Sequence, residues 1–165
     1  MKILYLMRHA KSSWSFDDLS DEQRPLNDRG RDDAPRMGQA LARRHARIDL
    51  LLASTAVRSL TTAALVAKEI DYPHERIQVR PEIYQADVRT LLQVVRESPD
   101  EAESVLLVGH NNTITDLANL LMTSPLSEEM PTASIVCLHF QTERWADVDR
   151  SNAEFYFFDC PRNAE

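Results

Sequence analysis

Short apolar runs in this sequence are followed, directly or within a few residues, by side chains that can do chemistry. These side chains are Arg8, His9, Arg58, Glu82 and His110. Imidazole can attack an electrophile or move a proton, and the planar guanidinium group matches phosphate oxygens in a two-point contact. A carboxylate could supply or take a proton. Histidine beside arginine therefore favours an anionic, tetrahedral substrate.

Each of these residues also has a structural interpretation. A strand-end histidine can simply satisfy a hydrogen bond, Arg58 could be a solvated residue in the first turn of a helix, and Glu82 could be an exposed loop carboxylate. The two histidines could instead bind a metal, but a metal site would also want carboxylates or thiolates nearby. Arginine repels a cation, so we expect neither a metal nor another cofactor.

The elements that must position these residues follow from apolar runs and periodicity. Continuous apolar runs predict strands at 3–7, 50–53, 77–79, 105–108, 135–140 and 155–158. Spacing of i, i+3, i+4 and i+7 predicts helices over about 27–44 and 56–70, after Asp87 and after Gly109. Strands that are apolar on both faces, separated by amphipathic helices, predict an α/β fold. We expect a three-layer α/β/α sandwich with a mainly parallel sheet.

This architecture explains why distant residues could meet. The carboxyl ends of parallel strands converge at one edge of a sheet, where α/β proteins bind ligands. Within the first expected helix, Pro35 should kink the helix or shift its start. Residues 10–26 show no periodicity and predict a long loop, in which Trp14 and Phe16 could line the mouth of the site or pin the loop.

Composition limits the class of protein. The 165 residues predict a single domain over 1–165, with 43% hydrophobic and 27% charged residues. A net charge of −7 argues against a nucleic-acid partner. No apolar run reaches the ~18 residues of a membrane helix, and the N-terminus does not resemble a signal peptide. Two cysteines predict no disulfide framework, so we expect a cytoplasmic protein; its oligomeric state stays open.

Four short motifs contain these residues or open the first expected helix. They are Arg8-His9-Ala10-Lys11-Ser12, Leu26-Asn27-Asp28-Arg29-Gly30, Ser54-Thr55-Ala56-Val57-Arg58 and Val108-Gly109-His110-Asn111. Together they resemble the motifs of the histidine phosphatase (phosphoglycerate-mutase-like) superfamily. The Ala-Lys-Ser continuation and the short chain are similar to the SixA-like phosphohistidine phosphatase branch. One departure is Asn112, where many members have proline, which could alter the start of the following helix.

The resemblance implies a phosphoglycerate-mutase-like fold and a role for each matched residue. His9 would be the nucleophile that becomes phosphohistidine, while Arg8, Arg58 and His110 would bind the phosphoryl oxygens. Glu82 would be the acid that protonates a leaving group. Lys11, Ser12 and Asn111 are further candidates for substrate binding.

The chain leaves little material for a lid between its core elements, and an open site suits a protein-borne phosphohistidine. We therefore expect a metal-independent phosphatase whose partner is a phosphorylated protein. Three alternatives remain: a phosphatase of small phosphomonoesters with the same mechanism, a non-catalytic module that binds phosphorylated ligands, and a metal-dependent hydrolase. To attack phosphorus, His9 must be neutral at one ring nitrogen while the other donates to a fixed acceptor.

Overall fold

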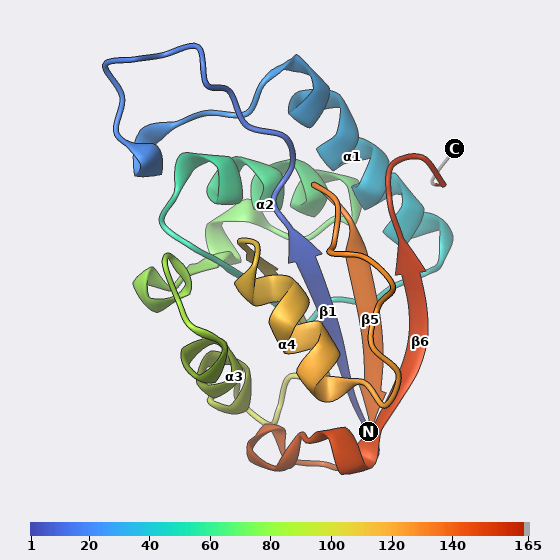
Figure 1. Ribbon diagram of the computed structural model, residues 1–165. Coiled ribbons are helices and arrows are strands. Elements are labelled where there is room, and N and C mark those ends of the chain that lie inside the picture. Colours follow the sequence, from blue (N-terminus) through green and yellow to red (C-terminus); the bar gives the residue numbers. More distant parts are fainter. Residues whose placement is uncertain (164–165) are drawn as a thin grey trace.

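The computed structural model describes residues 1–163 and consists of one mixed sheet with helices on both faces (Figure 1). The strands are β1 (Lys2–Arg8), β2 (Leu50–Ala53), β3 (Gln78–Val79), β4 (Ser104–Gly109), β5 (Ile135–Phe140) and β6 (Ala153–Asp159). The helices are α1 (Asp28–Arg43), α2 (Val57–Glu69), α3 (Val88–Arg96) and α4 (Thr113–Leu121). Every expected strand and helix is present, with ends shifted by one or two residues.

The sheet has the strand order β3-β2-β4-β1-β5-β6. The pairs β1–β4, β2–β4 and β2–β3 are parallel, whereas β5 is antiparallel to both β1 and β6. The mainly parallel sheet is therefore confirmed, with one strand of opposite direction. The first strand lies at the centre of the sheet, so its carboxyl end is next to that of β4.

Alternation along the central strand divides the core into two layers. Leu4 and Leu6 pack with the residues of α3 and α4, while Tyr5 and Met7 pack with those of α1 and α2. Successive side chains of a strand point to opposite faces, so an apolar run buries both faces of the sheet. The three-layer α/β/α sandwich is thereby confirmed.

The first helix begins where its capping residue predicts. Asn27 Oδ1 accepts a hydrogen bond from the backbone N–H of Gly30 at 2.9 Å, which satisfies one of the free donors of the first turn. The helix then runs through Pro35 to Arg43. The prediction that Pro35 could shift the start of this helix is wrong, because the Asn27 cap fixes it seven residues earlier, at Asp28.

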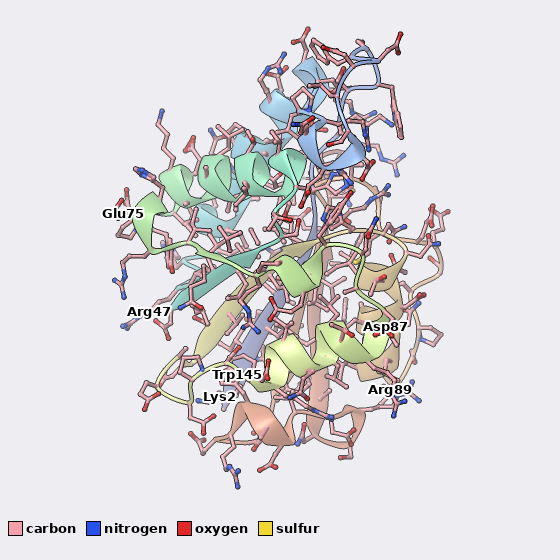
Figure 2. All side chains as sticks on the ribbon, turned by 90° about the vertical axis from the view of Figure 1, so that its left-hand side faces the viewer. Lys2, Arg47, Glu75, Asp87, Arg89 and Trp145 are labelled. Atoms are coloured by element: carbon pink, nitrogen blue, oxygen red, sulfur yellow. The ribbon has the colours of Figure 1, made fainter. Side chains whose placement is uncertain are left out.

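The end of the sheet opposite the carboxyl end of β1 is closed by a short helical turn at residues 145–147 (Figure 2). The Trp145 side chain is fully buried there, and its indole N–H donates to the carbonyl of Ala102 at 2.7 Å. Lys2 Nζ lies 5.9 Å from the centroid of the Trp145 ring. Within residues 1–163, no helix is long and apolar enough to cross a membrane.

Candidate active site

His9 lies directly after β1 and its side chain is buried, with 8% of the residue exposed. Its backbone N–H donates to the carbonyl of Gly109 at 3.1 Å, which joins the ends of β1 and β4. Its ring Nδ1 lies 2.7 Å from the carbonyl oxygen of Ala10. Because a carbonyl oxygen only accepts, Nδ1 carries the proton and Nε2 keeps its lone pair. This is the arrangement that a histidine nucleophile requires.

His110 follows β4 and faces the first histidine. The two ring centroids are 5.1 Å apart and the ring planes are tilted by 55°. Nε2 of His110 lies 2.7 Å from the hydroxyl oxygen of Ser54, at the end of β2. Nδ1 of His110 is buried and has no hydrogen-bond partner among the described residues. The expected convergence of the two imidazoles at the carboxyl edge of the sheet is therefore present.

Both imidazoles are electrically neutral at pH 7. Burial is the main reason that the pKa of His9 lies at about 3. The nearby His110, Arg58 and Arg8 also lower it, whereas the hydrogen bond to Ala10 raises it. Burial is also the main reason that the pKa of His110 lies at about 4, with the charge of Arg58 as the next cause. A neutral His9 has an unprotonated nitrogen available for attack.

The two arginines expected at the site contact it from different elements. Arg58, in the first turn of α2, is 6% exposed, and Arg8 is half-buried at the end of β1. One Arg8 Nη donates to the carbonyl of Met130 at 2.8 Å. The Nε atoms of both arginines are buried with no hydrogen-bond partner in the described part of the chain. Buried guanidinium donors of this kind suit an oxyanion.

Asp21 is a residue of the site that the sequence did not single out. Its carboxylate accepts hydrogen bonds from Arg58 Nη2 at 2.9 Å, from the Tyr84 hydroxyl at 2.7 Å and from Arg24 Nε at 3.1 Å. The Tyr84 hydrogen bond, together with Arg58 and Arg24, lowers the pKa of Asp21 to about 2. The Ser20-x-x-Gln23 pattern could have predicted the short helical turn that carries Asp21, but not its contact with Arg58.

A cavity of about 170 Å³ opens beside Arg58 and His110. Its lining residues are Asp21, Arg58, Ile83, Tyr84, Gln85, Ala86, Leu91, His110, Asn111 and Thr113. Among them, Asn111 was expected to bind substrate. Its side-chain amide donates to Glu129 at 2.9 Å and its carbonyl oxygen accepts from Thr115 at 2.5 Å, so its orientation is fixed.

Two further candidates, Lys11 and Ser12, do not line this cavity. The Ser12 hydroxyl is buried and accepts a hydrogen bond from Arg24 Nη1 at 2.9 Å. Lys11 is exposed, and its carbonyl accepts from the backbone N–H of Asn27 at 3.0 Å. These contacts shape the loop after His9, and they do not bring either side chain to the cavity.

Glu82 also lies outside the lining of the cavity. Its carboxylate is exposed and pairs with Arg80 at 2.7 Å, and this hydrogen bond lowers the pKa of Glu82. A carboxyl group held ionised by arginine is a poor proton donor at neutral pH. The geometry therefore gives no support to Glu82 as the acid, because the 3-10 turn over 81–83 turns Ile83, rather than Glu82, toward the cavity.

The arrangement of the site suits the binding of an oxyanion beside a neutral imidazole. Two neutral imidazoles and two guanidinium groups gather at the carboxyl edge of the sheet, and two of these four residues, Arg58 and His110, line the small cavity. Nowhere in residues 1–163 do three or more histidine, cysteine, aspartate or glutamate side chains group in a way that could hold a metal ion. Fold and site together define an α/β protein whose sheet edge is suited to bind an oxyanion beside a neutral histidine.

The chain belongs to the histidine phosphatase superfamily, branch 1, whose family profile matches residues 4–88. The resemblance expected from the four motifs is thus confirmed. An uncharacterised protein of Mycobacterium tuberculosis, Rv1276c, is 32% identical over 94% of this chain and 100% of its own length.

Solved structures are similar to this chain over nearly its whole fold. A protein provisionally assigned as the phosphohistidine phosphatase SixA, from Agrobacterium tumefaciens, is 27% identical with a TM-score of 0.83, covering 97% of this chain and 98% of its own. The protein histidine phosphatase SixA complexed with tungstate shares the fold with a TM-score of 0.83 at 23% identity, and the match covers 99% of each chain.

Proposed function

We propose that this protein is a metal-independent phosphatase that removes a phosphoryl group from protein phosphohistidine through a phosphohistidine intermediate on His9. The hydrogen bond from His9 Nδ1 to the carbonyl of Ala10 carries the proposal, because it leaves the lone pair of Nε2 free for phosphorus. The similarity to SixA proteins supports the same reaction class.

In the first step, Nε2 of His9 forms a bond to phosphorus and the P–N bond of the substrate breaks. The electron pair of that bond stays on the substrate nitrogen, and imidazole leaves neutral when its other ring nitrogen carries a proton. Phospho-His9 keeps its proton on Nδ1, donated to Ala10. Arg8 and Arg58 stabilise charge on the equatorial oxygens, and the transfer asks the protein mainly for positioning and charge stabilisation.

In the second step, water attacks phosphorus and the P–Nε2 bond breaks, returning the electron pair to Nε2 of His9. Because Nδ1 has remained protonated, His9 leaves as neutral imidazole in the tautomer with which it began. The water gives up its protons to solvent and to the phosphate released. This step restores the hydrogen bond between His9 and Ala10 without any tautomer change.

The ionised carboxylate that lines the cavity favours an imidazole leaving group over an alkoxide. An alkoxide needs a proton from a positioned acid, which typically contributes about 10²–10⁴-fold. Asp21 is the carboxyl group of the cavity lining, and its pKa of about 2 keeps it ionised at neutral pH. Its negative charge would instead stabilise the protonated ring of a substrate phosphohistidine, which then leaves as neutral imidazole. These observations support phosphohistidine over a small phosphomonoester.

The test compares a histidine-phosphorylated protein with glycerol 2-phosphate, an ester with an alkoxide leaving group, both with excess chelator. We expect release of phosphate from the phosphoprotein, an acid-labile phosphoryl group on His9 in rapid-quench samples, and loss of both in His9→Ala. His74→Ala, at an exposed histidine, is the matched control and should keep full activity. Turnover that survives His9→Ala would contradict the nucleophile, and a strong preference for the ester would favour the small-phosphomonoester alternative.

A further inference from the structure

Two large aromatic side chains are exposed on the loop between β1 and α1. Trp14 is 75% exposed and Phe16 is 50% exposed. A single exposed apolar residue is ordinary, but these two are two positions apart on one loop. In Figure 1 this loop, drawn in blue, extends beyond the carboxyl end of β1, the edge of the sheet that carries the candidate site. We call residues 13–20 the aromatic loop.

Direct contacts connect the aromatic loop to the site. The guanidinium carbon of Arg24 lies 3.5 Å from the centroid of the Trp14 ring. The same guanidinium donates to the carbonyl of Ser13 at 3.1 Å and to the carboxylate of Asp21 at 3.1 Å. Asp21 in turn accepts from Arg58. The side chain of Arg24 therefore lies between the exposed indole of Trp14 and the carboxylate of Asp21, and that carboxylate in turn binds Arg58.

The cavity next to His110 is small, and a ligand that fits inside it would not reach the aromatic loop. It measures about 170 Å³, below the roughly 300–1,000 Å³ of typical small-molecule pockets, and neither aromatic residue lines it. A phosphorylated metabolite bound there would not touch Trp14 or Phe16. A phosphoryl group carried by a folded protein would bring a much wider surface to the same edge of the sheet.

The charge of the loop limits what that surface can be. Asp17 and Asp18 follow Phe16 directly and are exposed, and Asp21 is about half exposed at the side of the site. Acidic groups next to aromatic rings complement a surface with basic residues around an apolar side chain, and like charges opposite them would be repelled. Tryptophan is also among the residues most enriched in the energetically dominant part of protein interfaces.

We propose that the aromatic loop is the docking surface for the protein that carries the phosphohistidine. The partner is a folded domain with an apolar side chain and basic residues beside its phosphorylated histidine. Trp14 and Phe16 pack on the apolar side chain, while Asp17 and Asp18 face the basic residues. This inference rests on the proposed function and assigns its substrate selectivity to contacts outside the catalytic residues.

The experiment measures kcat/KM of the full chain on two kinds of substrate. The first is a set of small folded domains phosphorylated on a surface histidine with phosphoramidate, some with basic and some with acidic surroundings; the second is free phosphohistidine. For Trp14→Ala/Phe16→Ala we expect at least a tenfold loss on the domains with basic surroundings, mainly through KM, and a change below twofold on free phosphohistidine. Asp17→Lys/Asp18→Lys should lower kcat/KM on the same domains.

The matched control replaces the exposed aromatics of β6, Phe155 and Tyr156, which are 48% and 62% exposed. Phe155→Ala/Tyr156→Ala should change neither substrate, and circular dichroism with thermal melting checks that both double variants are folded. If the double alanine variant of the loop unfolds, kcat/KM of Trp14→Phe and of Asp17→Lys/Asp18→Lys on the same two substrates tests the docking surface.

Two results would overturn the docking surface alone: no loss on any phosphorylated domain, or equal losses on domains and free phosphohistidine, which would mean that Trp14 only supports Arg24. Hydrolysis of neither substrate by the unaltered protein, with the ester hydrolysed instead, would overturn the proposed function and the docking surface together. Hydrolysis of phosphohistidine by the unaltered protein therefore tests the proposed function, and the losses of the loop variant on the two substrates test the docking surface.

Discussion

The two histidines are held by different kinds of partner, and the difference fits them for different work. The partner of His9 is a backbone carbonyl, which can only accept a hydrogen bond. The partner of His110 is the Ser54 hydroxyl, which can also donate. A neutral His110 whose Nε2 accepts from Ser54 carries its proton on the buried Nδ1. It can then donate to a phosphoryl oxygen without becoming a cation.

Ser54→Ala should therefore slow phosphoryl transfer. The alanine removes the group that orients His110, and the lost hydrogen bond of roughly 1–1.5 kcal/mol corresponds to about a tenfold lower kcat/KM. Steady-state kinetics between pH 5.5 and 8 should also show an altered pH profile, because a neutral His110 that loses the hydroxyl donating to its Nε2 is less stabilised and its pKa rises toward this range.

Ser98→Ala is the matched control for this change. Ser98 is another buried serine, and its hydroxyl has no hydrogen-bond partner among the described residues. Ser98 precedes β4, whereas the site lies after the end of this strand. The activity of Ser98→Ala should therefore stay within twofold of that of the unaltered protein. Equal pH profiles for Ser54→Ala and the unaltered protein would contradict a positioning role for Ser54.

Glu82→Gln tests the remaining candidate acid. The carboxylate is exposed and paired with Arg80, so we expect kcat/KM to change by less than twofold on both phosphohistidine and glycerol 2-phosphate, an ester whose alkoxide leaving group needs a proton. Activity on the two substrates is measured in parallel. A tenfold loss on the ester alone would mean that Glu82 does reach an alkoxide leaving group during catalysis.

At the scale of elements, the start of α1 is packed directly against the chain that follows His9. A Cβ added to Gly30 would lie 2.2 Å from the carbonyl oxygen of Lys11 and 3.0 Å from its backbone nitrogen. Neither atom can move without displacing the backbone two residues after His9. The glycine therefore permits a close approach that the site depends on.

Gly30→Ala should lower both stability and activity. Overpacking against fixed backbone costs typically about 1–3 kcal/mol, and the shift passes to the Ala10 carbonyl that holds His9. Gly38→Ala is the comparison, because its Cβ would meet the side chain of Glu69 at 2.8 Å in the contact between α1 and α2. Urea unfolding and kcat are measured for both. Loss of kcat in folded Gly38→Ala, equal to that in Gly30→Ala, would contradict a local effect.

The elements also explain which parts of the site the sequence could predict. Arg8, His9, Arg58 and His110 follow apolar runs, and the convergence of parallel strand ends brings them together. Asp21 belongs to a loop without periodicity, so nothing in its spacing predicted the contact with Arg58. The exposure of β6 was equally hidden, because an edge strand and a buried strand of phenylalanines look alike in sequence. Patterns predict elements, whereas the path of an irregular loop depends on tertiary contacts.

For the whole molecule, the buried neutral histidines make folding sensitive to acid. The pKa of His9 is about 3 and that of His110 about 4, whereas both groups titrate near 6.5 in the unfolded chain. Between these values the unfolded state binds more protons than the folded state, so stability falls as the pH decreases. The contribution of the two histidines is complete above pH 6.5 and declines steadily toward pH 4.

Between pH 7 and pH 5, each histidine held neutral should cost at most about 2 kcal/mol of unfolding free energy. Urea unfolding at half-unit intervals should therefore show a decline of up to about 4 kcal/mol across this range. His9→Asn removes one of the two groups and should nearly halve the decline, while His74→Asn, at an exposed histidine, should leave it unchanged. A decline that is the same in His9→Asn would mean that His9 is already protonated in the folded protein at pH 5, and a protonated His9 could not serve as the nucleophile there.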